Sequence, residues 1–175
     1  MPQSPTGAKA QPLQTKPGQF EMKSTAPIHS VYHTAETLIF PNAITLKILL
    51  SGKQTNGSQA IFEDIVEPGV GPGRHIHHHQ DETFFFLEGK FIAEVGGKTY
   101  ECNPGDVAFI PKGTVHAFKN IGDTGAKLRY MFSPARTIEE MFREFYQRSQ
   151  HSELTLEEMA KISLKHGQEF VGPPL

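Results

Sequence analysis

Three histidines and one glutamate stand at spacings that would let them bind a single metal ion. His75 and His77 are separated by one residue, so on a β-strand both imidazoles point to the same face. Glu82 can present a carboxylate from the next strand, and His116 can complete the site from a strand much further along the chain. Imidazole nitrogens with one carboxylate suit iron, manganese, nickel, cobalt, copper or zinc rather than magnesium or calcium. We therefore expect one divalent transition metal per subunit, bound by His75, His77, Glu82 and His116.

The histidine-rich run also allows two other interpretations. A solvated loop that picks up metal only in an affinity column would not account for Glu82 and His116 at these spacings. Strand parity would place His79 on the same face as His75 and His77, so the residues alone leave open a ligand set without Glu82. Four ligands leave two adjacent positions of an octahedral metal free, which is room for a substrate oxygen and dioxygen or for two waters.

We expect an apolar substrate pocket beside the metal, because strand parity continues from the ligands to aromatic side chains. Counting from Glu82 and His116 gives Phe84, Phe86 and Phe118, and Phe109 and Met131 are further candidates for the wall. Such a lining favours a flat aromatic or enol-type ligand, although these rings could also simply fill a small barrel. Sugar-phosphate isomerisation would require cations inside the barrel, and the nearest cation, Arg74, has the opposite parity to His75.

Short β-type runs separated by Gly and Pro predict an all-β sandwich or barrel that positions these residues. Gly96-Gly97 predicts a two-residue hairpin turn, because both residues tolerate a positive φ. The candidate strands are Ala43–Leu50, Gln59–Glu67, Thr83–Leu87, Phe91–Val95, Lys98–Cys102, Val107–Ile110, Val115–Phe118 and Ala126–Phe132.

After Pro134 the hydrophobic period becomes helical and predicts two helices. Thr137 with Glu140, and Thr155 with Glu158, match the capping box that starts a helix. We therefore divide the chain into a Pro-rich tail (1–27), a β-barrel domain (28–134) and a helical appendage (135–175).

The metal-ligand candidates belong to a longer pattern that resembles the cupin superfamily. Its two consensus motifs match Gly69, His75, His77, Glu82 and Gly89, and then Gly105, Pro111, Gly113, His116 and Asn120. The stretch Gly71-Pro-Gly-Arg-His-Ile-His-His-His-Gln-Asp-Glu-Thr-Phe-Phe-Phe-Leu-Glu-Gly89 is similar to the single-domain, quercetin-dioxygenase-like cupins, as is the closing segment 169–175. The resemblance implies a jelly-roll β-barrel with a central metal, favours Glu82 over His79 as a ligand, and implies a homodimer and oxygenase chemistry.

Composition excludes several classes of partner. The 17 basic and 19 acidic side chains leave a net charge of −2, so we expect no nucleic-acid partner and no membrane association. Apolar runs stay far below the ~18 residues of a membrane span, and we expect a cytoplasmic protein. The single cysteine, Cys102, excludes an intrachain disulfide. Exposed strand edges and amphipathic helices predict a homodimer.

These observations favour a metal-dependent dioxygenase that acts on a small aromatic or enol substrate and uses dioxygen. Glu82 is the candidate catalytic base, because it is the carboxylate that spacing places beside the metal. The alternatives are a metal-stabilised binding or sensor protein without turnover, and a non-redox isomerase. A fold alone does not distinguish these functions.

Overall fold

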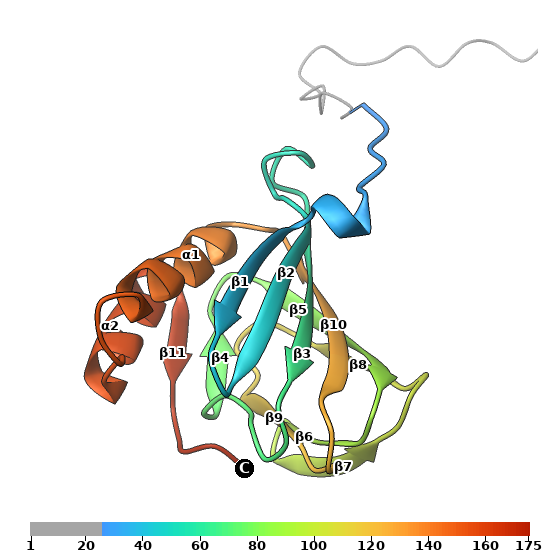
Figure 1. Cartoon of the computed structure of the whole chain (residues 1–175), viewed down its shortest axis with the longest axis vertical. Helices are drawn as coiled ribbons and strands as arrows, with labels where there is room; N and C mark the ends of the chain where they lie inside the picture. Colours follow the sequence, from blue (N-terminus) through green and yellow to red (C-terminus); the bar gives the residue numbers. More distant parts are fainter. Residues whose placement is uncertain (1–25) are drawn as a thin grey trace, which may run out of the picture.

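Two antiparallel β-sheets enclose the core of the computed structural model, which describes residues 26–175. Residues 1–25 of the predicted tail lie outside the described residues. One sheet has the strand order β1-β2-β3-β10-β5-β8 and the other β11-β4-β9-β6-β7 (Figure 1). A short 3-10 helix at Tyr32–Thr34 precedes them. The strands are β1 (Glu36–Phe40), β2 (Ile44–Leu50), β3 (Ala60–Val66), β4 (His75–His77), β5 (Asp81–Glu88), β6 (Phe91–Val95), β7 (Lys98–Cys102), β8 (Val107–Ile110), β9 (His116–Asn120), β10 (Ala126–Ser133) and β11 (Gln168–Phe170). The helices are α1 (Ile138–Ser149) and α2 (Leu156–Lys165), which confirms the predicted all-β class with two C-terminal helices.

Alternation of buried and exposed residues sets the inner face of the six-stranded sheet. On β5, Glu82, Phe84 and Phe86 are buried, while the residues between them are less so. Tyr130 of β10 lies between Phe84 and Phe62 in the strand register. Gly96 and Gly97, with φ of 59° and 77°, form the predicted two-residue turn between β6 and β7.

Three strands were absent from the candidate list: β1, β11 and β4, although the argument for the metal site had assumed a strand at His75 and His77. β1 pairs antiparallel with β2 and forms one edge of the six-stranded sheet. β11 pairs with β4, so that Gln168 lies opposite His77 and Phe170 opposite His75. Its three residues are too few to show a period, and the pairing arises only when the appendage folds back on the barrel. The segment predicted as a helical appendage therefore also adds a strand beside the ligand histidines.

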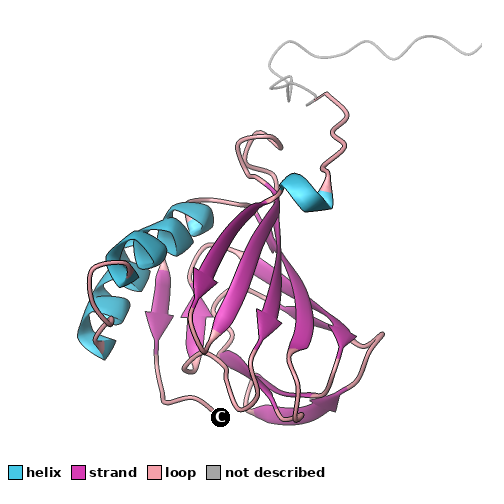
Figure 2. Cartoon of the chain, viewed as in Figure 1, coloured by secondary structure: helices cyan, strands magenta, loops and turns pink. Residues whose placement is uncertain are grey.

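The two helices lie at one side of the barrel, where α1 contacts β1 and α2 contacts β11 (Figure 2). Met141 and Phe145 of α1 are buried, as the helical period predicted. Thr155 and Glu158 form the predicted capping box at the start of α2. The other predicted box, Thr137 with Glu140, is wrong. Thr137 makes no side-chain hydrogen bond as the N-cap of α1, because its backbone is not in the extended conformation of a normal N-cap.

This difference predicts unequal effects of two threonine substitutions. Thr155→Ala should lower the free energy of unfolding by about 1 kcal/mol, because it removes the hydroxyl that accepts from the Glu158 N–H. Thr137→Ala is the matched control and should change it by less than ~0.5 kcal/mol. Urea denaturation of both variants is the measurement, and equal losses would contradict the assignment of the cap.

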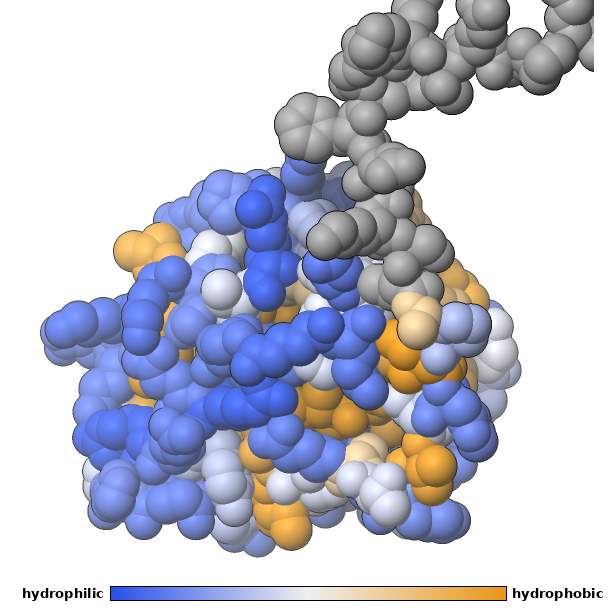
Figure 3. All heavy atoms as spheres, turned by 90° about the horizontal axis from the view of Figure 1, so that it is seen from above, coloured by the Kyte–Doolittle hydropathy of each residue, from blue (hydrophilic) through white to orange (hydrophobic). Residues whose placement is uncertain are grey.

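The surface in Figure 3 is mostly hydrophilic and carries separate apolar patches. Within residues 26–175, neither helix has the length and hydrophobicity that crossing a bilayer requires. Edge strand β8 exposes Val107 and Phe109.

Candidate metal centre

His75, His77, Glu82 and His116 come together in the interior as the spacing predicted, and the cluster could hold one metal ion. Their ligand atoms all lie within 4.8 Å of one another, and all four side chains are buried. β4 supplies the first two histidines, and β9 pairs with it so that His75 lies opposite His116. Glu82 comes from β5 in the other sheet. The cluster therefore joins the two sheets across the barrel interior.

Backbone carbonyls orient two of the imidazoles toward the centre of the cluster. His75 Nδ1 lies 2.8 Å from the Gly73 carbonyl oxygen, and His116 Nδ1 lies 2.9 Å from that of Thr114. When each Nδ1–H donates to its carbonyl, Nε2 is left to face a metal, an arrangement common to metal-binding histidines.

A glycine brings one loop against the strand that carries His116. A Cβ on Gly71 would lie 1.8 Å from the Phe118 carbonyl oxygen. Any other residue would push the loop away from β9, so glycine is required for this close approach.

His77 supplies the observation that fits a metal best. Both of its ring nitrogens are buried and have no hydrogen-bond partner among the described residues. Nε2 lies 3.4 Å from Glu82 Oε2, which in turn lies 2.8 Å from His116 Nε2. A buried polar nitrogen without a partner is costly, and coordination of a metal by Nε2 would remove part of that cost. The donor set of three imidazoles and one carboxylate fits a divalent transition metal.

The electrostatics of the cluster favour the metal-binding forms of Glu82 and His75. Burial acts to raise the pKa of Glu82, but the adjacent His116 and His77 imidazoles outweigh it and lower the pKa to about 2. Burial lowers the pKa of His75 well below its ordinary value, and the neighbouring imidazoles His116 and His77 lower it further. Burial acts to lower the pKa of His116, but the hydrogen bond with Glu82 outweighs it, so that the pKa is raised. An ionised carboxylate and a neutral His75 are the forms that bind metal.

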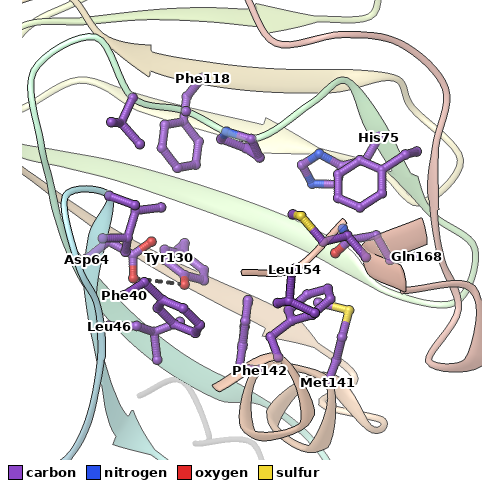
Figure 4. Close-up of a pocket in the computed structure, with 18 of the residues that line it drawn as sticks. Phe40, Leu46, Asp64, His75, Phe118, Tyr130, Met141, Phe142, Leu154 and Gln168 are labelled. Carbon is purple, nitrogen blue, oxygen red and sulfur yellow. Dashed lines mark hydrogen bonds between the residues drawn. The ribbon is translucent and has the colours of Figure 1, made fainter. Parts of the chain in front are cut away.

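A cavity of about 470 Å³ opens beside the cluster and is lined mainly by apolar side chains (Figure 4). His75, His77 and Glu82 form part of its wall. Phe84 and Phe118 also line it, as predicted. This volume lies within the usual range for small-molecule sites.

Three other predicted pocket residues do not line the cavity. Phe86 is buried in the core beyond the cavity wall. Phe109 is 60% exposed, because the inward residue of β8 is its neighbour Ile110. Met131 similarly belongs to the outward-facing residues of β10, since it stands between the buried Tyr130 and Phe132. The prediction for Phe109 and Met131 was wrong because neither strand contains a metal-ligand candidate from which the inward-facing residues could be counted.

Several cavity residues were missed from the sequence. Part of the wall comes from the C-terminal appendage, through Met141, Phe142, Phe145, Leu154, Met159, Gln168 and Phe170. Asp64 and Tyr130 add two polar groups from β3 and β10. The sequence does carry a signal for Asp64: it is an acidic residue that alternates with the apolar Phe62 and Val66 on the buried face of β3. His79, the alternative ligand, is exposed and lies outside the cluster.

Comparison with known families decides the class of this barrel. The family model described as a cupin domain matches residues 62–132. This segment is a cupin domain. The resemblance seen in the two sequence motifs is thereby confirmed, and the matched range runs from β3 to β10.

Curated relatives align with the cupin over part of their own length. The chain is 31% identical over 70 residues to an uncharacterized protein of Methanocaldococcus jannaschii, covering 40% of this chain and 56% of that protein. It is 30% identical over 73 residues to the quercetin 2,3-dioxygenase of Bacillus subtilis, covering 42% of this chain but 22% of that enzyme. It is 24% identical over 113 residues to the tetracenomycin polyketide synthase protein TcmJ of Streptomyces glaucescens, covering 65% of this chain and 69% of TcmJ.

Solved structures share the fold of the cupin. KdgF from Halomonas sp. superposes with a TM-score of 0.56 at 20% identity, covering 63% of this chain and 96% of KdgF. An RmlC-like cupin from Shewanella frigidimarina superposes with a TM-score of 0.54 at 21% identity, covering 63% of this chain and 94% of that protein. At this level of identity the likeness establishes the jelly-roll fold.

Proposed function

We propose that this cupin is a metal-dependent dioxygenase acting on a small aromatic or enol substrate. The observation that supports this most is the buried cluster of three histidines and Glu82 at the wall of an apolar cavity. The similarity to a quercetin 2,3-dioxygenase over 73 residues points in the same direction.

The metal would be a divalent transition metal held by His75, His77, Glu82 and His116. When bound, it would lower the pKa of a substrate hydroxyl group and favour reaction with dioxygen. Glu82 would accept the proton of that hydroxyl group. Its contacts with His77 and His116 are both made by Oε2, so we assign the proton to Oε1.

The cavity wall would hold and shield the substrate. Phe84 and Phe118 pack edge to face, with ring centroids 5.6 Å apart, and both line the cavity. Apolar walls exclude water from the reacting atoms and restrict the plane of an aromatic ring.

The test is oxygen uptake by untagged, metal-analysed protein with flavonols and catechols as substrates. We expect oxygen consumption that depends on metal content, and both atoms of ¹⁸O₂ in the product. A fully metal-loaded protein that consumes no oxygen with either substrate class would contradict the proposal.

A non-redox reaction on a similar substrate, such as an isomerisation or cyclisation, is a second candidate. The observation that favours it is the similarity to TcmJ, a polyketide synthase protein, over 65% of the chain. Product formed equally fast under strict exclusion of oxygen would support this candidate and contradict the dioxygenase.

We also propose that the protein forms a homodimer through β8. This strand is one edge of its sheet, and it exposes Val107 and Phe109 by 58% and 60%. Light scattering should give about twice the 19.5 kDa chain mass, and Phe109→Asp should give the monomer mass. Tyr100→Asp, which changes an exposed aromatic residue on the edge strand of the other sheet, is the control and should stay dimeric. A monomeric wild-type protein at micromolar concentration would contradict the proposal.

A further inference from the structure

One polar pair on the cavity wall lies outside the metal-ligand cluster. The Tyr130 hydroxyl donates a hydrogen bond of 3.1 Å to Asp64 Oδ1 (Figure 4). Both residues line the cavity, and both are buried, with 3% and 4% of their surface exposed for Asp64 and Tyr130. The strand neighbours opposite Asp64 are Leu46 and Leu128, so the pair interrupts an apolar surface.

The strand register places this pair at a distance from the cluster on the same inner face. Tyr130 lies opposite Phe84, which is two residues beyond Glu82 on β5. Asp64 lies on β3, on the other side of β10 from β5. Figure 4 shows Asp64 and His75 on opposite sides of the pocket. A ligand that contacts both must therefore extend across the cavity.

Asp64 has few hydrogen-bond partners in this position. A carboxyl group has about four acceptor sites, and within the described residues Asp64 receives the single hydrogen bond from Tyr130. Its neighbour Glu63, also buried, accepts hydrogen bonds from Tyr32 and from two nitrogens of Arg129. Glu63 is thus well satisfied on the outer face, whereas Asp64 is poorly satisfied at a cavity. Burying a poorly satisfied carboxyl group costs free energy, which a ligand could offset.

Burial raises the pKa of the Asp64 carboxyl well above its ordinary value; the Tyr130 hydroxyl acts in the opposite direction, and the charge of Glu82 adds to the increase. This shift favours a neutral carboxyl group, which can both donate and accept a hydrogen bond.

We propose that Asp64 and Tyr130 form a second polar subsite, which binds a distal hydroxyl group of a polyphenolic ligand whose other end lies at the metal cluster. This inference rests on the proposed function, and it specifies the substrate class as an elongated aromatic molecule with hydroxyl groups at both ends. The apolar wall between the two polar ends would contact the rings of the ligand, and the cavity volume of about 470 Å³ suits a ligand of this size.

Two flavonols separate this subsite from the metal cluster. Quercetin has hydroxyl groups on its distal rings, whereas 3-hydroxyflavone has only the oxygen pair expected at the metal. Tyr130→Phe and Asp64→Leu should each weaken the binding of quercetin by calorimetry about 10-fold, because each removes a buried hydrogen bond. Both variants should keep the wild-type metal content and change the affinity for 3-hydroxyflavone by less than ~2-fold. Tyr146→Phe removes a hydroxyl group outside the cavity wall and is the control.

A stability measurement tests the pair without any ligand. The double variant Asp64→Leu/Tyr130→Phe should have an unchanged or higher Tm, because an apolar pair can replace a buried polar pair without loss. A fall of more than ~6 °C, equivalent to about 2 kcal/mol, would show a structural pair and overturn the proposal. So would equal weakening of both flavonols, or no weakening of quercetin.

The outcomes also separate this proposal from the proposed function. If both flavonols bind and quercetin binding depends on the pair, but no oxygen is consumed, the dioxygenase is wrong and the subsite stands. If oxygen is consumed but the variants do not discriminate between the flavonols, the subsite is wrong and the dioxygenase stands. If neither flavonol binds the wild-type protein, the assigned ligand class and the subsite are both overturned.

Discussion

Replacing His77 or His116 by alanine is expected to remove most of the bound metal while the barrel stays folded. Each substitution deletes one of four donors that lie within 4.8 Å of one another. The remaining ligands then lack the geometry that a transition metal requires, so occupancy should fall at least ~10-fold. Elemental analysis of untagged protein is the measurement, with circular dichroism to show that the sheets persist.

His79→Ala is the matched control for these variants. His79 belongs to the same histidine-rich run but is exposed and lies outside the cluster. Its removal should leave the metal content unchanged. Wild-type occupancy in both the His77→Ala and the His116→Ala protein would refute the ligand assignment.

Glu82→Gln is expected to retain metal but to lower oxygen consumption about 100-fold. The amide oxygen of glutamine can still coordinate the metal, but the amide cannot accept a proton at neutral pH. The substitution therefore separates Glu82 as a ligand from Glu82 as a base. Oxygen-electrode traces with a flavonol, together with elemental analysis of the same sample, provide both readouts.

Glu88→Gln is the control, since Glu88 lies on the same strand and its side chain is 65% exposed, paired with Lys127. It should turn over at the wild-type rate. Unchanged turnover by metal-loaded Glu82→Gln protein would leave Glu82 as a ligand only, and the proposed proton transfer would be wrong.

The residue pattern was sufficient to find the histidine pair because its information is local, and the family resemblance then favoured Glu82 over His79. The two-residue period of a strand places His75 and His77 on one face whatever the barrel does. Parity from Glu82 likewise gave Phe84, and parity from His116 gave Phe118, both on the cavity wall. In each case a ligand on the strand anchored the direction of the neighbouring side chains.

Where no such anchor existed, the sequence was ambiguous. Phe109 and Met131 are large apolar residues in predicted strands, as Phe84 is, but their side chains face away from the interior. A shift of one residue reverses the face of every side chain in a strand. In the sheet register both residues lie opposite Thr83 of β5. Only this pairing decides that they face outward.

The sequence by itself therefore determined the β-class, the two helices and the four residues that could hold a metal. Apart from Phe84 and Phe118, tertiary structure alone decided what surrounds them. The pairing of β11 with β4, the helix residues in the cavity wall and the meeting of Asp64 with Tyr130 all join segments far apart in the chain. Such contacts depend on how the sheets and helices pack, because hydrophobic burial is non-directional and a local period cannot encode which distant surface covers a given face.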